Sequence, residues 1–401
     1  MTYYVIIAFC VIILLAYIFD ITSKHTKIPS VILLILTGMA INYFASFWMI
    51  GIPDMSRLLP VMGTLGLILI VLEGSMDLTL SRDKRKLIVG SVSSAILLFV
   101  VFVSVFAYIA VYYLHFDLKM SVINIIPLAI ISSAVAIPSA TGLGKADREF
   151  VVYESSLSDI IGILVFDFIL LSSGSLGAGV TRFFAELVIT LLASVFFSAG
   201  LAVMLHKINH HVKYVIIMTA IILVYALAKL IHLPSLLVVL IFGMVMNNNV
   251  FFENRFSSKI IDFEEFNADL SSFKNIVAEM TFIVRCFFFF LFGFYTSVAD
   301  LLNLNNLLIT FVISAAIFIF RALFFKTVLR MPLNPLVYFA PRGLITILLF
   351  FSIPSVMLLP FMNVGVITQI IFITILMMTF GNIFFQKADD MVQKDRNENS
   401  H

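Results

Sequence analysis

The sequence predicts an all-α polytopic membrane protein of about thirteen spanning helices, arranged as two inverted six-helix repeats with two broken helices that cross. The chain is 62% hydrophobic and only 12% charged, whereas soluble proteins have about 25% charged residues. Its mean hydropathy is +1.12, and apolar stretches long enough to cross about 30 Å of hydrocarbon recur along the whole chain. Basic residues gather between alternate stretches, as they do in membrane proteins with a fixed orientation.

The first apolar stretch has no basic residue before it and no small-residue cleavage pattern after it, so it is interpreted as a spanning helix rather than a cleaved signal peptide. The stretch at 233–247 is short for a span. In chain order, helices are expected near 3–19, 28–48, 57–76, 87–114, 121–141, 151–173, 183–205, 214–230, 233–247, 274–297, 305–330, 334–354 and 363–385.

The distribution of basic residues predicts the orientation of these helices. Of the 25 Lys and Arg residues, three fall inside predicted helices, four lie on one side of the membrane and the remaining eighteen lie on the other. Positive residues favour the cytoplasmic side. The N-terminus is therefore expected outside and the C-terminus inside, in a lipid bilayer that we interpret as a bacterial inner membrane. The four on the outer side are Arg57, Lys119, Arg182 and Lys229.

An odd number of helices divides into repeat one (1–173), a linker helix (183–205) and repeat two (214–386), followed by a short cytoplasmic tail (387–401). The helix at 121–141 would then correspond to the helix at 334–354. Broken helices in corresponding positions indicate a midplane binding site, although proline kinks without function are also common. The connection from 248 to 273 mixes Phe with charged residues and predicts an interfacial helix. The two breaks are expected at Ser132-Ser133-Ala134 with Pro138 and at Pro341-Arg342-Gly343.

Three carboxylates lie inside the apolar stretch 151–173, and two of them, Glu154 and Asp159, stand close together near its start. An ionised side chain near the bilayer centre costs at least about 2.5–3.5 kcal/mol, so it usually faces a partner or a water-filled cavity. On a helix, Glu154 and Ser158 share a face, whereas Asp159 lies roughly 140° away from Glu154. We therefore expect Asp159 to face an ion or proton pathway and Glu154 to pair with an arginine. A structural acid paired to arginine is the alternative for Asp159.

The remaining charged residues inside helices have more than one candidate partner. Glu73 is expected to pair with Arg285 or Arg342, with a role as ion ligand as the alternative. Arg285 either balances Asp159 or Glu73 or extends its charge toward the membrane surface. Asp167, about two turns beyond Asp159, is a weaker candidate for the pathway. Two cysteines in apolar stretches, Cys10 and Cys286, imply neither a disulfide nor a metal site, and no cofactor is indicated.

These residues resemble the monovalent cation:proton antiporters of the sodium/proton exchanger type. The family pattern Glu-x-x-x-Asn-Asp corresponds to Glu154-x-x-x-Ser158-Asp159. The resemblance implies that Asp159 binds the ion, Na⁺ in the first instance. It also implies that Arg321, in Phe320-Arg321-Ala322-Leu323, pairs with Glu154, and that Arg342 belongs to the family's Gly-x-Arg-Gly signature, with Ala340 at the first glycine. Further similarity covers Lys27-Ile28-Pro29 with Gly38 and Leu72-Glu73-Gly74.

Two positions depart from the family. Ser132-Ser133-Ala134 stands where the family usually has Thr-Asp-Pro, and Ser158 replaces the asparagine before Asp159. Hydroxyl oxygens and exposed carbonyls can still ligate a hard cation. Ser132, Ser133 and Ser158 are therefore expected to complete the coordination, with ion preference and stoichiometry left open.

The resemblance implies a secondary antiporter, rather than an enzyme, that exchanges Na⁺, Li⁺ or K⁺ for H⁺ by alternating access, a transport typical of pH homeostasis. Cation and proton would compete at Asp159. It also implies a homodimer, and no nucleic-acid partner is expected. The alternatives are a potassium-efflux antiporter or channel-like exchanger, which the missing acid and amide favour, and a non-transporting membrane sensor of the same fold.

Overall fold

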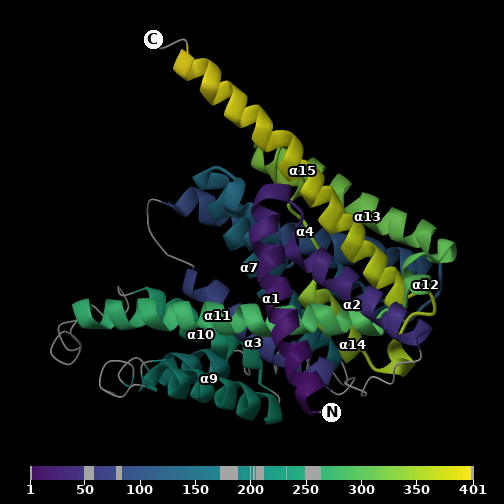
Figure 1. Ribbon diagram of the computed structural model, residues 1–401. Coiled ribbons are helices and arrows are strands. Elements are labelled where there is room, and N and C mark those ends of the chain that lie inside the picture. Colours follow the sequence, from purple (N-terminus) through teal and green to yellow (C-terminus); the bar gives the residue numbers. More distant parts are fainter. Residues whose placement is uncertain are drawn as a thin grey trace.

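The computed structural model describes residues 2–48, 58–77, 84–171, 188–198, 200, 201, 204, 212–231, 233–248 and 263–398, and every regular element in this part of the chain is helical (Figure 1). Nine stretches of it are long and apolar enough to cross a membrane. The α-helices are α1 (Thr2–Thr26), α2 (Ser30–Phe47), α3 (Leu58–Asp77), α4 (Arg85–Tyr112), α5 (Leu118–Ala129), α6 (Ser133–Ser139), α7 (Lys145–Leu171), α9 (Lys213–Leu230), α10 (Ser235–Asn247), α11 (Phe263–Tyr295), α12 (Val298–Leu301), α13 (Leu304–Phe324), α14 (Leu344–Ser352) and α15 (Val364–Glu398).

Contacts between helices divide the described chain into two bundles. The first bundle consists of α1, α2, α3, α9, α10 and α11, and the second consists of α4 to α7 with α12 to α15. Packing between the bundles is sparser and runs mainly through α3 and α10 of the first bundle and α6, α7 and α14 of the second. The bundles therefore meet along a limited interface that includes both short helices of the interrupted segments.

Close packing inside the first bundle depends on two glycines where α2 crosses α11. A Cβ atom on Gly38 would lie 2.2 Å from the carbonyl oxygen of Phe290, and one on Gly293 would lie 2.1 Å from that of Ile35. These distances leave no room for a side chain at either position. Small residues let membrane helices approach to backbone contact, where van der Waals packing is strongest.

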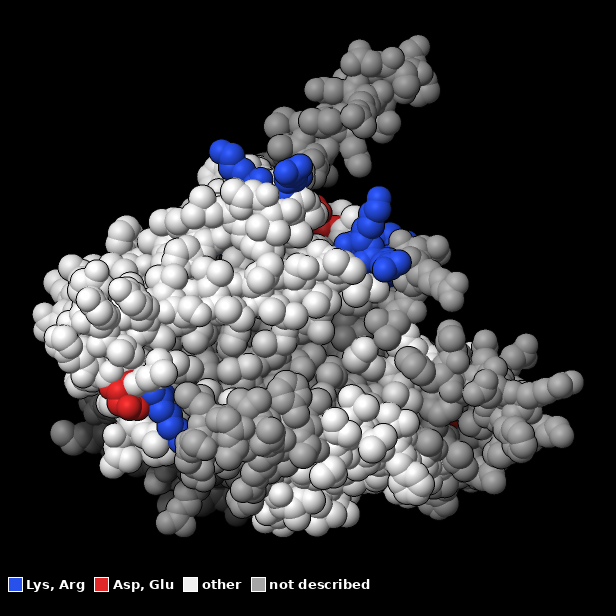
Figure 2. All heavy atoms as spheres, turned by 180° about the vertical axis from the view of Figure 1, so that it is seen from behind, with Lys and Arg blue, Asp and Glu red and all other residues white. Residues whose placement is uncertain are grey.

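The surface is that of a protein embedded in lipid. Only 6% of the apolar window of α1 is buried, although its mean hydropathy is 2.5. Figure 2 shows a broad uncharged face, with most of its Lys and Arg side chains gathered at the end from which α15 projects in Figure 1. Exposed apolar side chains of this kind are unfavourable in water and favourable in hydrocarbon.

Three predicted elements differ from the observed ones. The predicted connection up to residue 273 is wrong after 262, because α11 begins at Phe263 and buries Phe266 and Phe273; residues 249–262 lie outside the described part. The helix expected at 334–354 is helical over α14 only, preceded by a short 3-10 turn at Leu336–Tyr338 and by residues 339–343, which form no regular element. The predicted tail is a continuation of α15 to Glu398. Within the expected helix at 183–205, the described residues are 188–198, 200, 201 and 204, and all of them are helical.

Candidate functional site

Two interrupted helices cross inside the second bundle. α5 ends at Ala129, residues 130–132 are extended and α6 begins at Ser133. The non-helical segment 339–343 lies against this break, and the backbone N–H of Ser132 donates to the carbonyl oxygen of Pro341 at 2.9 Å. Gly343 permits this approach, because a Cβ atom there would lie 2.6 Å from the Ser132 hydroxyl oxygen. The crossing that paired breaks predict is therefore present.

Asp159 belongs to α7, and its side chain contacts Ser133, the first residue of α6. Its Oδ2 accepts hydrogen bonds from the backbone N–H of Ser133 at 3.2 Å and from the Ser133 hydroxyl. The residue is 1% exposed, and its other oxygen, Oδ1, has no hydrogen-bond partner. A buried polar atom without a partner is unfavourable and needs an explanation in a native structure.

A small cavity of about 10 Å³ borders Asp159, near the lower limit for one water-sized occupant. Its lining comes from both bundles: α3 and α10 on one side, α6 and α7 on the other. Ser156 lines it too, and the Ser156 hydroxyl is a second buried oxygen without a partner. Two oxygens without partners thus belong to residues that line one cavity between the bundles.

The other predicted serines lie at the break in different ways. The Ser158 hydroxyl oxygen accepts the backbone N–H of Ile131 at 3.0 Å, so it satisfies a donor of the extended segment. The Ser132 hydroxyl is buried and lacks a hydrogen-bond partner. Ser158 therefore stabilises the break, whereas Ser132 and Ser133 have hydroxyls near the crossing.

Glu154 and Arg321 form a buried bidentate ion pair. The two Arg321–Glu154 distances are 2.7 Å (Nη1 to Oε1) and 2.6 Å (Nη2 to Oε2), and each side chain is 1% exposed. The Ser94 hydroxyl also donates to Oε1, and Arg321 Nε donates to the Leu336 carbonyl at 3.0 Å. The pair ties α7 to α13 in the geometry that stabilises buried charges best.

Arg342 belongs to the segment 339–343, and its side chain lies against the C-terminal end of α5. Its Nε donates to the carbonyl oxygen of Leu128 at 2.7 Å, where the helix leaves its last carbonyls without intrahelical partners. Its Nη1 donates to the Ala340 carbonyl at 3.3 Å. Arg285 is half-buried, and its Nη1 lies 3.4 Å from the Ala134 carbonyl oxygen. Both arginines thus bond to backbone carbonyls at the crossing, and the pairing of Glu73 with either of them stays a prediction.

One remaining candidate from the sequence, Asp167, lies apart from the crossing. Asp167 pairs with Lys229 at 3.1 Å, joining α7 to α9. Ser156 and Ser94 were missed by the sequence reasoning. Ser156 carried a signal, because it precedes Asp159 by three residues and so lies on a neighbouring part of the same helix face. Ser94 carried none, because it lies sixty residues from Glu154 in the chain.

Comparison with known proteins identifies the family of the chain. The model of the family described as "Sodium/hydrogen exchanger, transmembrane" matches residues 10–385. The chain belongs to the sodium/hydrogen exchanger family. This family consists of membrane transporters rather than enzymes, and the substrates it exchanges are a cation and a proton. No curated protein matches the chain.

Two solved structures share the fold of this exchanger-family chain. A structure of the sodium proton antiporter MjNhaP1 from Methanocaldococcus jannaschii at pH 8 has a TM-score of 0.68 and 18% identity, covering 95% of this chain and 98% of that one. An electron-microscopy structure of the same antiporter has a TM-score of 0.68 and 19% identity, covering 98% and 97%. The likeness over nearly the full length of both chains shows the antiporter fold.

Proposed function

We propose that the protein exchanges Na⁺ for H⁺ across the membrane by alternating access, with Asp159 binding either the cation or the proton. The observation that supports this most directly is the buried Oδ1 of Asp159, which has no partner and belongs to a residue lining a cavity between the two bundles. A buried ionised carboxylate is unfavourable unless a counter-charge neutralises it. A proton or a monovalent cation neutralises it equally well, but the two cannot do so together.

The surrounding oxygens suit a hard cation. Carboxylate, hydroxyl and backbone carbonyl oxygens are the ligands that such ions prefer, and the cavity offers Asp159 with the hydroxyls of Ser133 and Ser156. Ser132 is a further ligand after a small movement at the crossing. Ser133 stands where the family has the aspartate of Thr-Asp-Pro, and Ser158 stands where it has asparagine. We therefore include Li⁺ and K⁺ among the transported cations.

The charged residues around the site have supporting roles in this proposal. Glu154 and Arg321 hold α7 against α13, and Arg342 and Arg285 compensate charge and carbonyl dipoles at the crossing. In alternating access, the bundles move relative to each other when a proton or a cation neutralises Asp159, and this movement opens the site to the other side of the membrane. We further propose, from the basic residues, an outside N-terminus and an inside C-terminus, and a homodimer in the membrane.

Reconstitution into liposomes tests the proposal. Each of Na⁺, Li⁺ and K⁺ is added outside vesicles that hold a proton gradient and a pH-sensitive dye, for the wild type, Asp159→Asn and Asp167→Asn. We expect cation-dependent proton movement in the wild type and in Asp167→Asn, which carries the same change on the same helix. We expect none in Asp159→Asn, because an amide cannot exchange a proton for a cation.

Each other outcome selects a different function. Proton movement with K⁺ alone would identify a potassium-efflux antiporter, which the missing acid and amide favour. Absence of flux with every cation in the wild type would indicate a non-transporting sensor. Full activity of Asp159→Asn would place the binding site elsewhere.

A further inference from the structure

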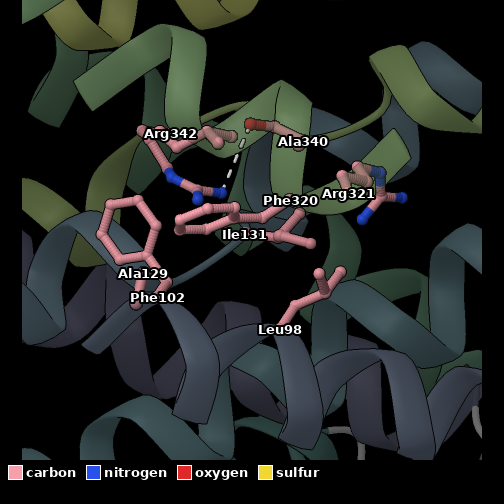
Figure 3. A pocket seen from close by; sticks show the side chains of 9 residues that line it. Leu98, Phe102, Ala129, Ile131, Phe320, Arg321, Ala340 and Arg342 are labelled. Carbon is pink, nitrogen blue, oxygen red and sulfur yellow. Dashed lines mark hydrogen bonds between the residues drawn. The ribbon is translucent and has the colours of Figure 1, made fainter. Parts of the chain in front are cut away.

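A second cavity, of about 20 Å³, lies inside the second bundle on the other side of the crossing. It has room for one water molecule or a small ion. Arg321 and Arg342 line it together with apolar side chains that include Leu98, Phe102 and Phe320 (Figure 3). It shares no lining residue with the cavity beside Asp159, so it is separate from the proposed cation site.

The charges at this cavity do not balance. Both oxygens of Glu154 are bonded by Arg321, and the hydrogen bonds of Asp159 go to Ser133. Among the described residues, no carboxylate lies within ion-pair distance of Arg342, whose side chain bonds only to backbone carbonyls. The group of Glu154, Arg321 and Arg342 therefore carries one net positive charge, and a buried charge without a counter-charge is strongly unfavourable.

The cavity also offers donors without acceptors. A guanidinium has five N–H donors. Arg342 uses one on the Leu128 carbonyl and one on the Ala340 carbonyl, and Arg321 uses three on Glu154 and Leu336. In the described residues the remaining donors have no acceptor, and the other side chains that line the cavity are all aliphatic or aromatic. Such a site suits a ligand that accepts hydrogen bonds and carries negative charge.

We propose that this cavity binds one small monovalent anion, such as chloride, in contact with the Arg342 guanidinium. The net charge of the surrounding residues requires a single negative charge, and a cavity of about 20 Å³ favours a monatomic ion over a larger organic anion. Guanidinium groups suit buried ion pairs because they are weakly hydrated. The anion would stabilise α4, α5 and α13 around the segment 339–343.

Thermal unfolding of the purified full-length protein tests the proposal without reference to transport. The melting temperature is measured in sodium chloride, sodium bromide and sodium gluconate at equal Na⁺ concentration and ionic strength. Gluconate is too large for the cavity. We expect the wild type to melt roughly 2 °C or more higher in chloride or bromide, with saturation as the halide concentration rises. Equal melting in all three salts would overturn the proposal.

A matched pair of variants locates the effect. Leu98→Phe places a ring in the cavity, whereas Leu97→Phe makes the same change at the preceding residue, which is 42% exposed on α4. We expect the halide effect to disappear in Leu98→Phe and to remain in Leu97→Phe. A halide effect of wild-type size in folded Leu98→Phe would show that the anion binds elsewhere.

Crystals of the wild type grown in bromide give an independent result if Leu98→Phe does not fold. We expect an anomalous difference peak beside the guanidinium of Arg342. A cavity that contains only water, with no anomalous peak, would contradict the proposal.

Discussion

Glu154 and Asp159 are five residues apart on α7 and have very different surroundings. Glu154 has both oxygens bonded by Arg321 and a further bond from Ser94. Asp159 has one bonded oxygen, Oδ2, and one without a partner, Oδ1. A carboxylate with both oxygens bonded gains little free energy from binding a cation. A carboxylate with one oxygen unpartnered gains more. These two buried acids of α7 can therefore serve structure and transport separately.

The Glu154–Arg321 pair gives the first prediction. Arg321→Met leaves Glu154 buried and unpaired, which is expected to cost about 3–5 kcal/mol of stability. The double variant Glu154→Gln with Arg321→Met is expected to regain much of this loss, because no buried charge remains. Lys229→Met breaks an ion pair whose lysine is 54% exposed, so it should cost no more than about 1 kcal/mol. Unfolding curves in detergent measure all three, and a double variant no more stable than Arg321→Met would contradict the argument.

Ser133 gives the second prediction. Ser133→Ala removes the hydroxyl that bonds Asp159 and lines the same cavity. If that hydroxyl contributes to cation binding, we expect the apparent KM for Na⁺ to rise about tenfold, which corresponds to about 1.4 kcal/mol. Ser139→Ala is the control on α6, because its hydroxyl bonds to the Val135 carbonyl away from Asp159. Sodium-dependent dye signals in proteoliposomes measure both, and an equal KM in both variants would remove Ser133 from the site.

The same assay checks competition between the two substrates. Because a proton on Asp159 excludes the cation, the apparent KM of the wild type for Na⁺ should rise as the pH is lowered. A KM independent of pH would contradict binding of both ions at one carboxylate.

At the residue scale, the sequence was informative where a polar residue was out of place in an apolar stretch. Asp159 and Glu154 could be selected because burying a charge is costly, whereas Arg321 was assigned to Glu154 from the resemblance to the exchanger family. The bond from Ile131 to Ser158 could not be predicted, because serine is common in membrane helices and its partner depends on the conformation of the break. The bond from Ser94 to Glu154 depends on how α4 packs on α7, which no local pattern encodes.

Among the elements, the crossing of α2 and α11 gives the third prediction. Gly293→Ala places a methyl group where the Ile35 backbone now lies, so the helices must separate. We expect a loss of roughly 1–3 kcal/mol of stability, as for other overpacked interiors. Gly144→Ala is the control, because a Cβ atom there meets nothing within 4 Å. Melting temperatures in detergent compare the two, and equal stability would show that the helices separate without cost.

The elements also show why sequence located the breaks better than the helix ends. Proline and serine disturb helical backbone directly, so the interruptions near 132 and 341 were predictable. The start of α11 was not, because hydropathy reports where hydrocarbon begins rather than where the helical hydrogen bonds begin. Phe266, Leu270, Phe273 and Val277 recur at helical spacing and are buried, so α11 extends as a helix through a more polar segment.

On the scale of the whole molecule, the cavity beside Asp159 lies where the two bundles meet. Its lining residues come from α3 and α10 of the first bundle and from α6 and α7 of the second. A change in the relative position of the bundles therefore changes access to Asp159 without unfolding either one. The glycine contacts of α2 with α11 and the Glu154–Arg321 pair each lie within one bundle, so both are compatible with rigid-body movement.

The last prediction concerns this movement. The Lys229–Asp167 ion pair joins α9 of the first bundle to α7 of the second, whereas the Lys213–Asp269 pair joins α9 to α11 within the first bundle. In a background with Cys10 and Cys286 replaced by alanine, cysteines at 229 and 167 are linked by a short thiol-specific reagent that reduction cleaves. We expect the link to stop cation-dependent proton movement in proteoliposomes and reduction to restore it.

A link between cysteines at 213 and 269 has the same chemistry inside one bundle and should leave transport intact. If α7 keeps its position relative to α9 throughout the cycle, both linked proteins will transport equally, and alternating access by movement of the bundles will be excluded. If only the link between the bundles stops transport, the two bundles must move past each other for Asp159 to exchange its ion, because the two links have the same chemistry and only one of them joins the bundles.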